Sequence, residues 1–149
     1  LVFTDWRQLP ALTNAFQAAG FTWRGIVAWN KGRASRTPHT GYFRHQCEYV
    51  VWGSKGALGK SPSGPFDGCT THHTRPQEKQ HPTGKPESLM DELVRVCEPG
   101  GLILDPFMGS GTTGVAALRR GCRFTGIELN AHYFSVAQAR LTGTEQRSD

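Results

Sequence analysis

The residues with the clearest chemical potential are three glycines within residues 103–119, ILDPFMGSGTTGVAALR. Gly109, Gly111 and Gly114 have the spacing Gly-x-Gly-x-x-Gly, after an apolar run and before small residues typical of a helix. Glu128 ends the next apolar run, nineteen residues after Gly109. In such a strand–turn–helix–strand unit, glycines let the backbone approach a nucleotide, and the distal acid accepts hydrogen bonds from ribose hydroxyls. The pattern predicts a site for an adenosine-containing ligand.

A carboxylate just before the glycines bears on which adenosine ligand is bound. Asp105 and Pro106 stand between the apolar run and the turn. A dinucleotide would place its pyrophosphate at the helix N-terminus, where the Asp105 carboxylate would repel it. S-adenosylmethionine carries ribose hydroxyls and an ammonium group but no phosphate. Asp105 and Glu128 together therefore favour S-adenosylmethionine over NAD, which stays the alternative as the cofactor of an oxidoreductase.

Two further ligand motifs fail on their spacing. GSKGALGKS (53–61) is similar to a phosphate-binding loop, but two residues rather than four separate Gly56 from Gly59. Four potential metal ligands lie close in the sequence and match no regular zinc spacing. They are Cys69, His72, His73 and His81. We therefore predict neither a nucleoside triphosphate site nor a metal site.

Length and composition describe one globular domain. The chain has 149 residues, of which 37% are apolar and 19% charged, and this length corresponds to about one domain. No apolar run approaches the roughly 18 residues that a membrane helix needs. The four cysteines have no Cys-x-x-Cys spacing, which favours reduced thiols in a cytosolic protein.

The positive charge is concentrated in the middle of the chain. The net charge is +5, and residues 31–80 hold eight Lys and Arg against three Asp and Glu, which accounts for the whole excess. A basic segment between near-neutral segments is typical of a protein that binds a polyanion. A solvated basic loop is the alternative that charge alone leaves open.

Hydropathy patterns predict alternating strands and helices. Apolar and β-branched runs predict strands over residues 1–5, 21–29, 47–52, 102–104 and 122–129. Helical spacing of apolar residues predicts helices over residues 6–19, 87–98, 112–120 and 131–141. Residues 54–81, rich in Gly, Pro, Ser, Thr and Lys, predict an irregular lobe with a functional role. The alternation predicts a parallel, doubly wound α/β sheet.

Several of these segments resemble one known family. ILDPFMGSGTTGVAALRRG (103–121), followed by FTGIEL (124–129), is similar to the S-adenosylmethionine-binding motif of β-class amino-group DNA methyltransferases of bacteria and phages. HPTGKP (81–86) resembles the His-Pro-Thr-x-Lys-Pro element of that class. AWNKG (28–32) and RHQCEYVVWGSKG (44–56) resemble the strands between its catalytic motif and its target-recognition region. The resemblance covers nearly the whole chain.

The resemblance implies a fold and a cofactor site. It implies a single S-adenosylmethionine-dependent domain over residues 1–149, of Rossmann-like doubly wound methyltransferase fold, with a short, basic, irregular target-recognition loop at 54–80. Asp105 would contact the methionine ammonium, and Glu128 would hold the ribose hydroxyls. The turn around the methionine part would consist of Phe107, Gly109, Ser110, Gly111 and Thr112. Thr83 and Lys85 would line the same pocket from the other side.

The resemblance also implies a reaction and partners. The reaction would be methyl transfer to the exocyclic amino group of a flipped adenine, with cytosine less favoured. The partners would be double-stranded DNA, a second copy in a homodimer and a cognate restriction endonuclease, in the cytoplasm of a bacterial or phage-infected cell. Candidate phosphate contacts are Lys31, Arg33, Arg36, Arg44, Lys55 and Lys60.

One motif of the family is absent from the chain, the catalytic Asp-Pro-Pro-Tyr. LVFTDW (1–6) fits the strand that follows this motif in the family. The resemblance therefore places the motif, and a central strand, upstream of Leu1. We expect an N-terminally truncated, incomplete fold that by itself is inactive, and we assign no catalytic residue. A non-catalytic cofactor- or DNA-binding remnant is the alternative.

Overall fold

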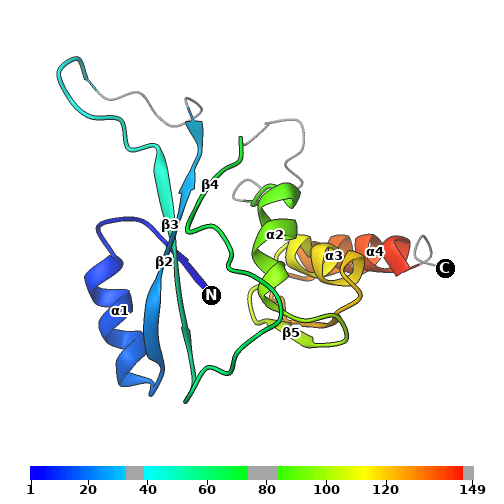
Figure 1. Ribbon diagram of the computed structural model, residues 1–149. Coiled ribbons are helices and arrows are strands. Elements are labelled where there is room, and N and C mark those ends of the chain that lie inside the picture. The colour runs from blue at the N-terminus through cyan, green and yellow to red at the C-terminus, as the bar shows by residue number, and fades with distance from the viewer. Residues whose placement is uncertain (33–38, 74–83, 146–149) are drawn as a thin grey trace. The chain divides into compact units, whose positions relative to one another are not determined.

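The computed structural model describes residues 1–32, 39–73 and 84–145 (Figure 1). The chain divides into two compact units, Leu1–His73 and Thr74–Asp149. Arg33, Arg36 and Thr83, three of the predicted contact residues, lie outside the described residues. Among the helices that are described, none is both long and apolar enough to cross a membrane.

The Leu1–His73 unit is built on a four-stranded sheet in the order β1-β3-β2-β4. Strand β3 pairs antiparallel with both β1 and β2, and β4 joins the other side of β2 in parallel. Strands β2 and β3 run side by side as a long hairpin (Figure 1). The elements in chain order are β1 (Val2–Thr4), α1 (Leu9–Ala18), β2 (Thr22–Asn30), β3 (Cys47–Ser54) and β4 (Cys69–Thr71).

The core of this unit lies on the central strands. Val50 and Val51 are fully buried, and Trp29 is only 2% exposed. The Trp29 Nε1 group donates a hydrogen bond to the carbonyl of His72, 2.9 Å away, and so connects β2 to the segment that follows β4. A Cβ atom at Gly53 would lie 2.2 Å from the Thr22 carbonyl oxygen. Glycine is therefore needed where the ends of β2 and β3 meet.

The pairing in this unit corrects the prediction of a wholly parallel sheet. Parallel pairing requires a crossover connection between strands, usually a helix. No helix was predicted between residues 29 and 47, and without one β2 and β3 pair antiparallel. Strand β4 was also missed, because its three residues, Cys-Thr-Thr, carry no apolar pattern within the segment predicted to be irregular.

The Thr74–Asp149 unit contains the predicted strand–helix–strand arrangement. Strands β5 and β6 pair in parallel, with Leu102 opposite Arg123 and Asp105 opposite Gly126. Helix α3 connects them and packs against α2, α4 and both strands. The elements are α2 (Glu87–Leu93), a 3-10 helix (Val94–Val96), β5 (Leu102–Asp105), α3 (Thr112–Arg119), β6 (Arg123–Gly126) and α4 (Ala131–Glu145).

Small and apolar side chains fill the space around α3. Val115, Ala116 and Ala117 on α3 are buried, together with Leu89 of α2. A Cβ atom at Gly114 would lie 2.6 Å from the side chains of Phe124 and Leu141, so this glycine allows α3 to approach β6 and α4 closely. The small residues of the motif thus have a packing role beside any ligand role.

Candidate functional site

The predicted ligand-binding turn follows β5, and its first acid holds both ends of the turn. Asp105 is half-buried at the last position of β5. One of its carboxylate oxygens accepts a hydrogen bond from the backbone N–H of Phe107 at 3.0 Å. The other accepts one from the Thr113 hydroxyl at 2.6 Å, a short bond typical of a hydroxyl donating to an ionised acceptor. Asp105 therefore fixes the start of the turn against the first turn of α3.

The second acid connects the turn to the neighbouring strand. Glu128 follows β6, and its Oε2 accepts a hydrogen bond from the Gly109 backbone N–H at 2.9 Å. Its Oε1 accepts one from the Asn130 N–H at 2.8 Å. Next to this contact, the Met108 N–H donates to the Ile127 carbonyl at 3.0 Å. Glu128 thus lies directly beside the glycine turn, as the nineteen-residue spacing predicted.

The glycines of the turn adopt the conformation that favours glycine. Gly109 and Gly111 have φ angles of 53° and 79°, in the left-handed region that other residues adopt rarely. A Cβ atom at Gly111 would lie 3.0 Å from the Cβ of Ala137 in α4, so this glycine faces a packed helix. A Cβ atom at Gly109 would meet nothing within 4 Å. Gly109 is therefore the glycine whose backbone a ligand can approach.

Two of the predicted turn residues face the protein. Ser110 is 5% exposed. Arg140 of α4 donates from Nη1 to the Ser110 carbonyl at 2.5 Å and contacts the hydroxyls of Ser110 and Thr112 at 3.3 and 3.4 Å. Phe107, in contrast, is 89% exposed. Phe107 is therefore exposed to solvent, while Ser110 and Thr112 anchor the turn to α4.

Arg140 itself is held by an acid that sequence reasoning did not identify. Its Nη2 donates to Glu87 Oε1 at 2.6 Å, and Arg119 contacts the other oxygen of Glu87 at 2.8 Å. Burial raises the pKa of Glu87, but hydrogen bonds from Arg119 and Arg140 outweigh it and hold the pKa of this carboxyl below its ordinary value. Nothing in the sequence distinguished Arg140 from an ordinary surface residue, because a basic residue near the end of a helix normally lies in solvent.

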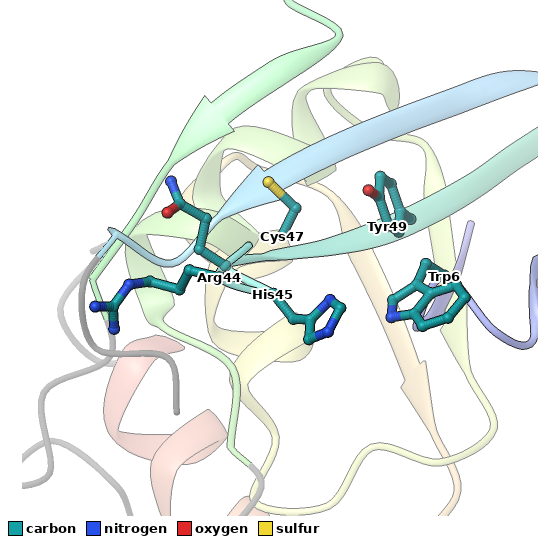
Figure 2. Close-up of a pocket in the computed structure, with 6 residues that line it drawn as sticks. Trp6, Arg44, His45, Cys47 and Tyr49 are labelled. Carbon is teal, nitrogen blue, oxygen red and sulfur yellow. The ribbon is translucent and has the colours of Figure 1, made fainter. Parts of the chain in front are cut away.

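The residues predicted to contact DNA phosphates differ in their exposure and in their partners. Lys31 donates to Glu48 at 2.8 Å, and its side chain is only 22% exposed. Lys55 and Lys60 are exposed, and the Lys55 ammonium lies 5.8 Å from the centre of the Phe21 ring. Arg44 is half-buried and lines a pocket (Figure 2). Lys85, predicted on the cofactor side, is half-buried just before α2.

Comparison with known proteins then decides the family. Residues 1–139 match the N6/N4 family described as DNA methylase. The chain belongs to the N6/N4 DNA methylase family. This confirms the resemblance carried by residues 103–129 and 81–86, and it places the chain among amino-group DNA methyltransferases.

Two curated relatives show how much of such a protein the chain represents. It is 34% identical over 145 residues to the Escherichia coli K12 protein named "Putative methylase YubD", covering 97% of this chain and 62% of that protein. It is 32% identical over 144 residues to Type II methyltransferase M2.DpnII of Streptococcus pneumoniae, covering 85% of this chain and 54% of that enzyme. The chain thus spans between about half and three-fifths of these relatives.

Solved structures of DNA methyltransferases share the fold. The M1.HpyAVI–SAM complex matches with a TM-score of 0.77 and 26% identity, over 93% of this chain and 72% of that one. The PvuII DNA methyltransferase, described as cytosine-N4-specific, matches with a TM-score of 0.72 at 20% identity, over 94% of this chain and 62% of that one. The predicted mixed α/β methyltransferase fold is confirmed over the part that the chain shares.

Proposed function

We propose that this chain binds S-adenosylmethionine at the glycine turn, as part of a DNA methyltransferase that methylates the exocyclic amino group of a base. The observation that carries the proposal is the pair of strand-end carboxylates beside an approachable turn. Asp105 and Glu128 lie at the ends of neighbouring parallel strands, and Gly109 between them has open space above its backbone.

Both carboxylates retain capacity for a ligand. An ionised carboxylate has about four lone-pair sites on its two oxygens. The hydrogen bonds described for Asp105 occupy one site on each oxygen, and the same holds for Glu128. The remaining sites suit donors such as an ammonium group and ribose hydroxyls. The same two negative charges disfavour a pyrophosphate, and this supports S-adenosylmethionine over NAD.

The turn residues divide into contacts and anchors. We assign the methionine ammonium to Asp105 and the ribose hydroxyls to Glu128. Phe107 offers an exposed aromatic ring beside them. Ser110 and Thr112 hold the turn to Arg140, so we expect them to act on the cofactor by positioning the turn. Thr83 and Lys85 remain predicted contacts from the family element.

The bound cofactor supplies an activated methyl group on its sulfonium. The residues of this chain bind the cofactor and orient it, which is the part of catalysis that positioning provides. The 149 residues contain no Asp-Pro-Pro-Tyr tetrapeptide, so we assign no catalytic residue among them, and a purely cofactor-binding role is the second candidate. The His-Pro-Thr-x-Lys-Pro element favours adenine as the target base, with cytosine as the alternative.

DNA is the substrate that the family implies, and we place its contacts in the Leu1–His73 unit. Arg44, Lys55 and Lys60 are our proposed phosphate contacts there, while Lys31 is paired with Glu48. The target-recognition role of residues 54–80 remains a prediction. A homodimer, a cognate endonuclease and a cytoplasmic location rest on the resemblance alone.

Calorimetric titration tests the cofactor site directly. The chain is titrated with S-adenosylhomocysteine, the demethylated product, and separately with NADH. We expect saturable binding of S-adenosylhomocysteine and none of NADH. Binding of NADH alone would refute the proposal and favour an oxidoreductase. Methyl transfer from labelled cofactor into DNA then separates the two candidates: incorporation excludes a purely cofactor-binding role.

A further inference from the structure

The Arg140 guanidinium of α4 joins two other elements of the Thr74–Asp149 unit. Its Nη1 donates to the Ser110 carbonyl of the glycine turn at 2.5 Å. Its Nη2 donates to Oε1 of Glu87, the first residue of α2, at 2.6 Å. The Arg140 side chain is only 16% exposed. The two ends of one planar, largely buried group therefore hold the turn and the start of α2 together.

The contact with Ser110 lies where the turn is least constrained. Ser110 stands between Gly109 and Gly111, whose φ angles are 53° and 79°. Glycine loses more conformational freedom than any other residue when its backbone is fixed. The Gly109 N–H is bonded to Glu128 at 2.9 Å. Glu128 thus holds the start of this short segment, and Arg140 holds its middle.

The charge of Arg140 opposes the preference of α3. Nη1 of Arg140 also lies 3.4 Å from the hydroxyl of Thr112, the first residue of α3. The N-terminus of a helix carries a partial positive charge, so a cation beside it is unfavourable. The Glu87 carboxylate supplies the compensating negative charge. A local preference that is broken and then compensated in this way is typical of a functional site.

Glu87 has a second arginine partner, which provides a comparison within the same cluster. Arg119, the last residue of α3, lies 2.8 Å from Glu87 Oε2 and 3.6 Å from Asp91. Among the described side-chain contacts, those of Arg119 are with these two acids of α2, whereas Arg140 also contacts the turn. The two arginines therefore share one carboxylate and differ in their contact with the turn.

We propose that Arg140 is a positioning residue of the cofactor site, which fixes the Ser110 peptide so that the Gly109 backbone faces the ligand. Glu87 in turn fixes Arg140. The inference rests on the proposed cofactor site and adds two residues that act on the cofactor without touching it. Both ends of the guanidinium are engaged by the protein, so Arg140 preorganises the turn. Preorganisation raises affinity because the turn is ordered before the ligand arrives.

Calorimetric titration with S-adenosylhomocysteine compares Arg140→Met with Arg119→Met. Each variant removes one guanidinium from Glu87, but only Arg140→Met also releases the turn. The stoichiometry reports the folded fraction, and the dissociation constant reports the affinity of the folded site. We expect about 10-fold weaker binding in Arg140→Met, as when a residue that orients a metal ligand is replaced, and unchanged affinity in Arg119→Met. Equal affinities in the two variants would overturn the inference and leave the cofactor site in place.

Arg140→Lys is the conservative variant, and it carries the comparison if Arg140→Met does not fold. Lysine keeps the charge but lacks the planar fork that reaches two partners, so the affinity of Arg140→Lys should lie between those of Arg140→Met and the unmodified chain. An affinity of Arg140→Lys equal to that of the unmodified chain would show that the charge alone suffices, and the proposed bridging role would be wrong.

A double-mutant cycle tests the role of Glu87. Glu87→Gln should weaken binding of S-adenosylhomocysteine in the unmodified chain but not in Arg140→Met, because we expect Glu87 to act through Arg140. Equal losses in the two backgrounds would show that Glu87 acts independently of Arg140, contrary to the inference.

Hydrogen exchange in the absence of ligand separates positioning from a general structural role. Amides of residues 107–112 should exchange faster in Arg140→Met than in Arg119→Met, whereas the amides of α4 should exchange equally in both variants. Faster exchange throughout the unit would show that Arg140 is only structural, and the inference would be wrong. If the unmodified chain does not bind S-adenosylhomocysteine, the proposed cofactor site fails and the inference fails with it, a result distinct from equal binding by the two variants.

Discussion

The two compact units differ sharply in how they use charge. Residues 1–73 carry eight basic and three acidic side chains, whereas residues 74–149 carry nine of each. In the described part of the second unit, several charged side chains have defined partners. Asp105 and Glu128 hold the glycine turn, and Glu87 pairs with two arginines. In the first unit, Arg7 pairs with Asp5 and Lys31 with Glu48, but the basic side chains still exceed the acidic ones by five. The comparison indicates that the second unit uses balanced charge to hold its glycine turn, whereas the first unit keeps an excess of positive charge.

The largest effect is expected on cofactor affinity, which should depend on an acid of the second unit and not on one of the first. Glu128→Ala removes a charged hydrogen-bond acceptor beside Gly109, so affinity for S-adenosylhomocysteine should fall by about 1.5–3 kcal/mol, roughly 10- to 150-fold. Calorimetry measures this loss. Asp67→Ala, which removes an exposed carboxylate of the other unit, should not change it. Equal affinities in Glu128→Ala and the unmodified chain would place the cofactor elsewhere.

A second change tests the packing beneath the turn. Gly114→Ala introduces a methyl group 2.6 Å from Phe124 and Leu141, and overpacking of this kind costs about 1–3 kcal/mol of unfolding free energy. Gly143→Ala is the matched control in α4, since a Cβ there meets nothing within 4 Å, and it should stabilise by up to about 1 kcal/mol. Urea unfolding measures both. A neutral Gly114→Ala would show that α3 can shift without cost.

The basic unit is tested by the salt dependence of DNA binding. Arg44→Gln should reduce the slope of log affinity against log salt by about one, because one phosphate contact is lost. Lys31→Gln removes the same charge, but the Lys31 ammonium is bonded to Glu48, so the slope should stay the same. Fluorescence anisotropy with labelled duplex at several salt concentrations measures both. If the two variants change the slope equally, the ion pair does not withhold Lys31 from DNA.

The smallest effect concerns pH. The pKa of Glu87 is lower in the folded state than its ordinary value, so its contribution to stability is present above the unfolded pKa of about 4.3 and is lost as pH falls through the folded pKa. Glu87 is well exposed, at 44% of its side chain, and the contribution is correspondingly small.

Urea unfolding gives the free energy of unfolding of Glu87→Gln and of the unmodified chain at each pH from 7 to 3. The difference between these two free energies should become smaller as the solution becomes acidic. Burial raises the pKa of the neighbouring Asp91, so this residue changes the stability of the chain with pH in the opposite direction. Comparing the variant with the unmodified chain at each pH separates the contribution of Glu87 from that of Asp91. A gap that is constant with pH would show that the arginine pairs do not stabilise ionised Glu87.

Sequence patterns predicted the second unit better than the first. The strand–turn–helix–strand order around residues 102–126 was predicted correctly because consecutive elements pair with each other there. In the first unit β3 pairs with both β1 and β2, and β4 pairs with β2 across about forty residues. The lack of a predicted helix between β2 and β3 was the available signal for their antiparallel pairing. No local pattern encodes the pairing of β1 with β3 or of β4 with β2, so these came only from the structure.

The same contrast applies within the candidate site. Glycine spacing and the two acids predicted the turn because each depends on local backbone geometry. Arg140 and its contacts with Ser110 and Thr112 were missed, because which way a turn side chain faces depends on the helix packed behind it. Here that helix is α4, thirty residues further along the chain.

The sequence by itself determined the family, the strand-end acids and the location of the basic segment, because these follow from residue types and short spacings. Only the tertiary structure decided that Glu128 reaches the Gly109 backbone, that Lys31 is paired with Glu48, and that the rings of Trp6 and His45 stack on each other. The physical reason is that a side chain's role depends on which neighbours compete for its hydrogen bonds and faces, and folding brings those neighbours from distant parts of the chain.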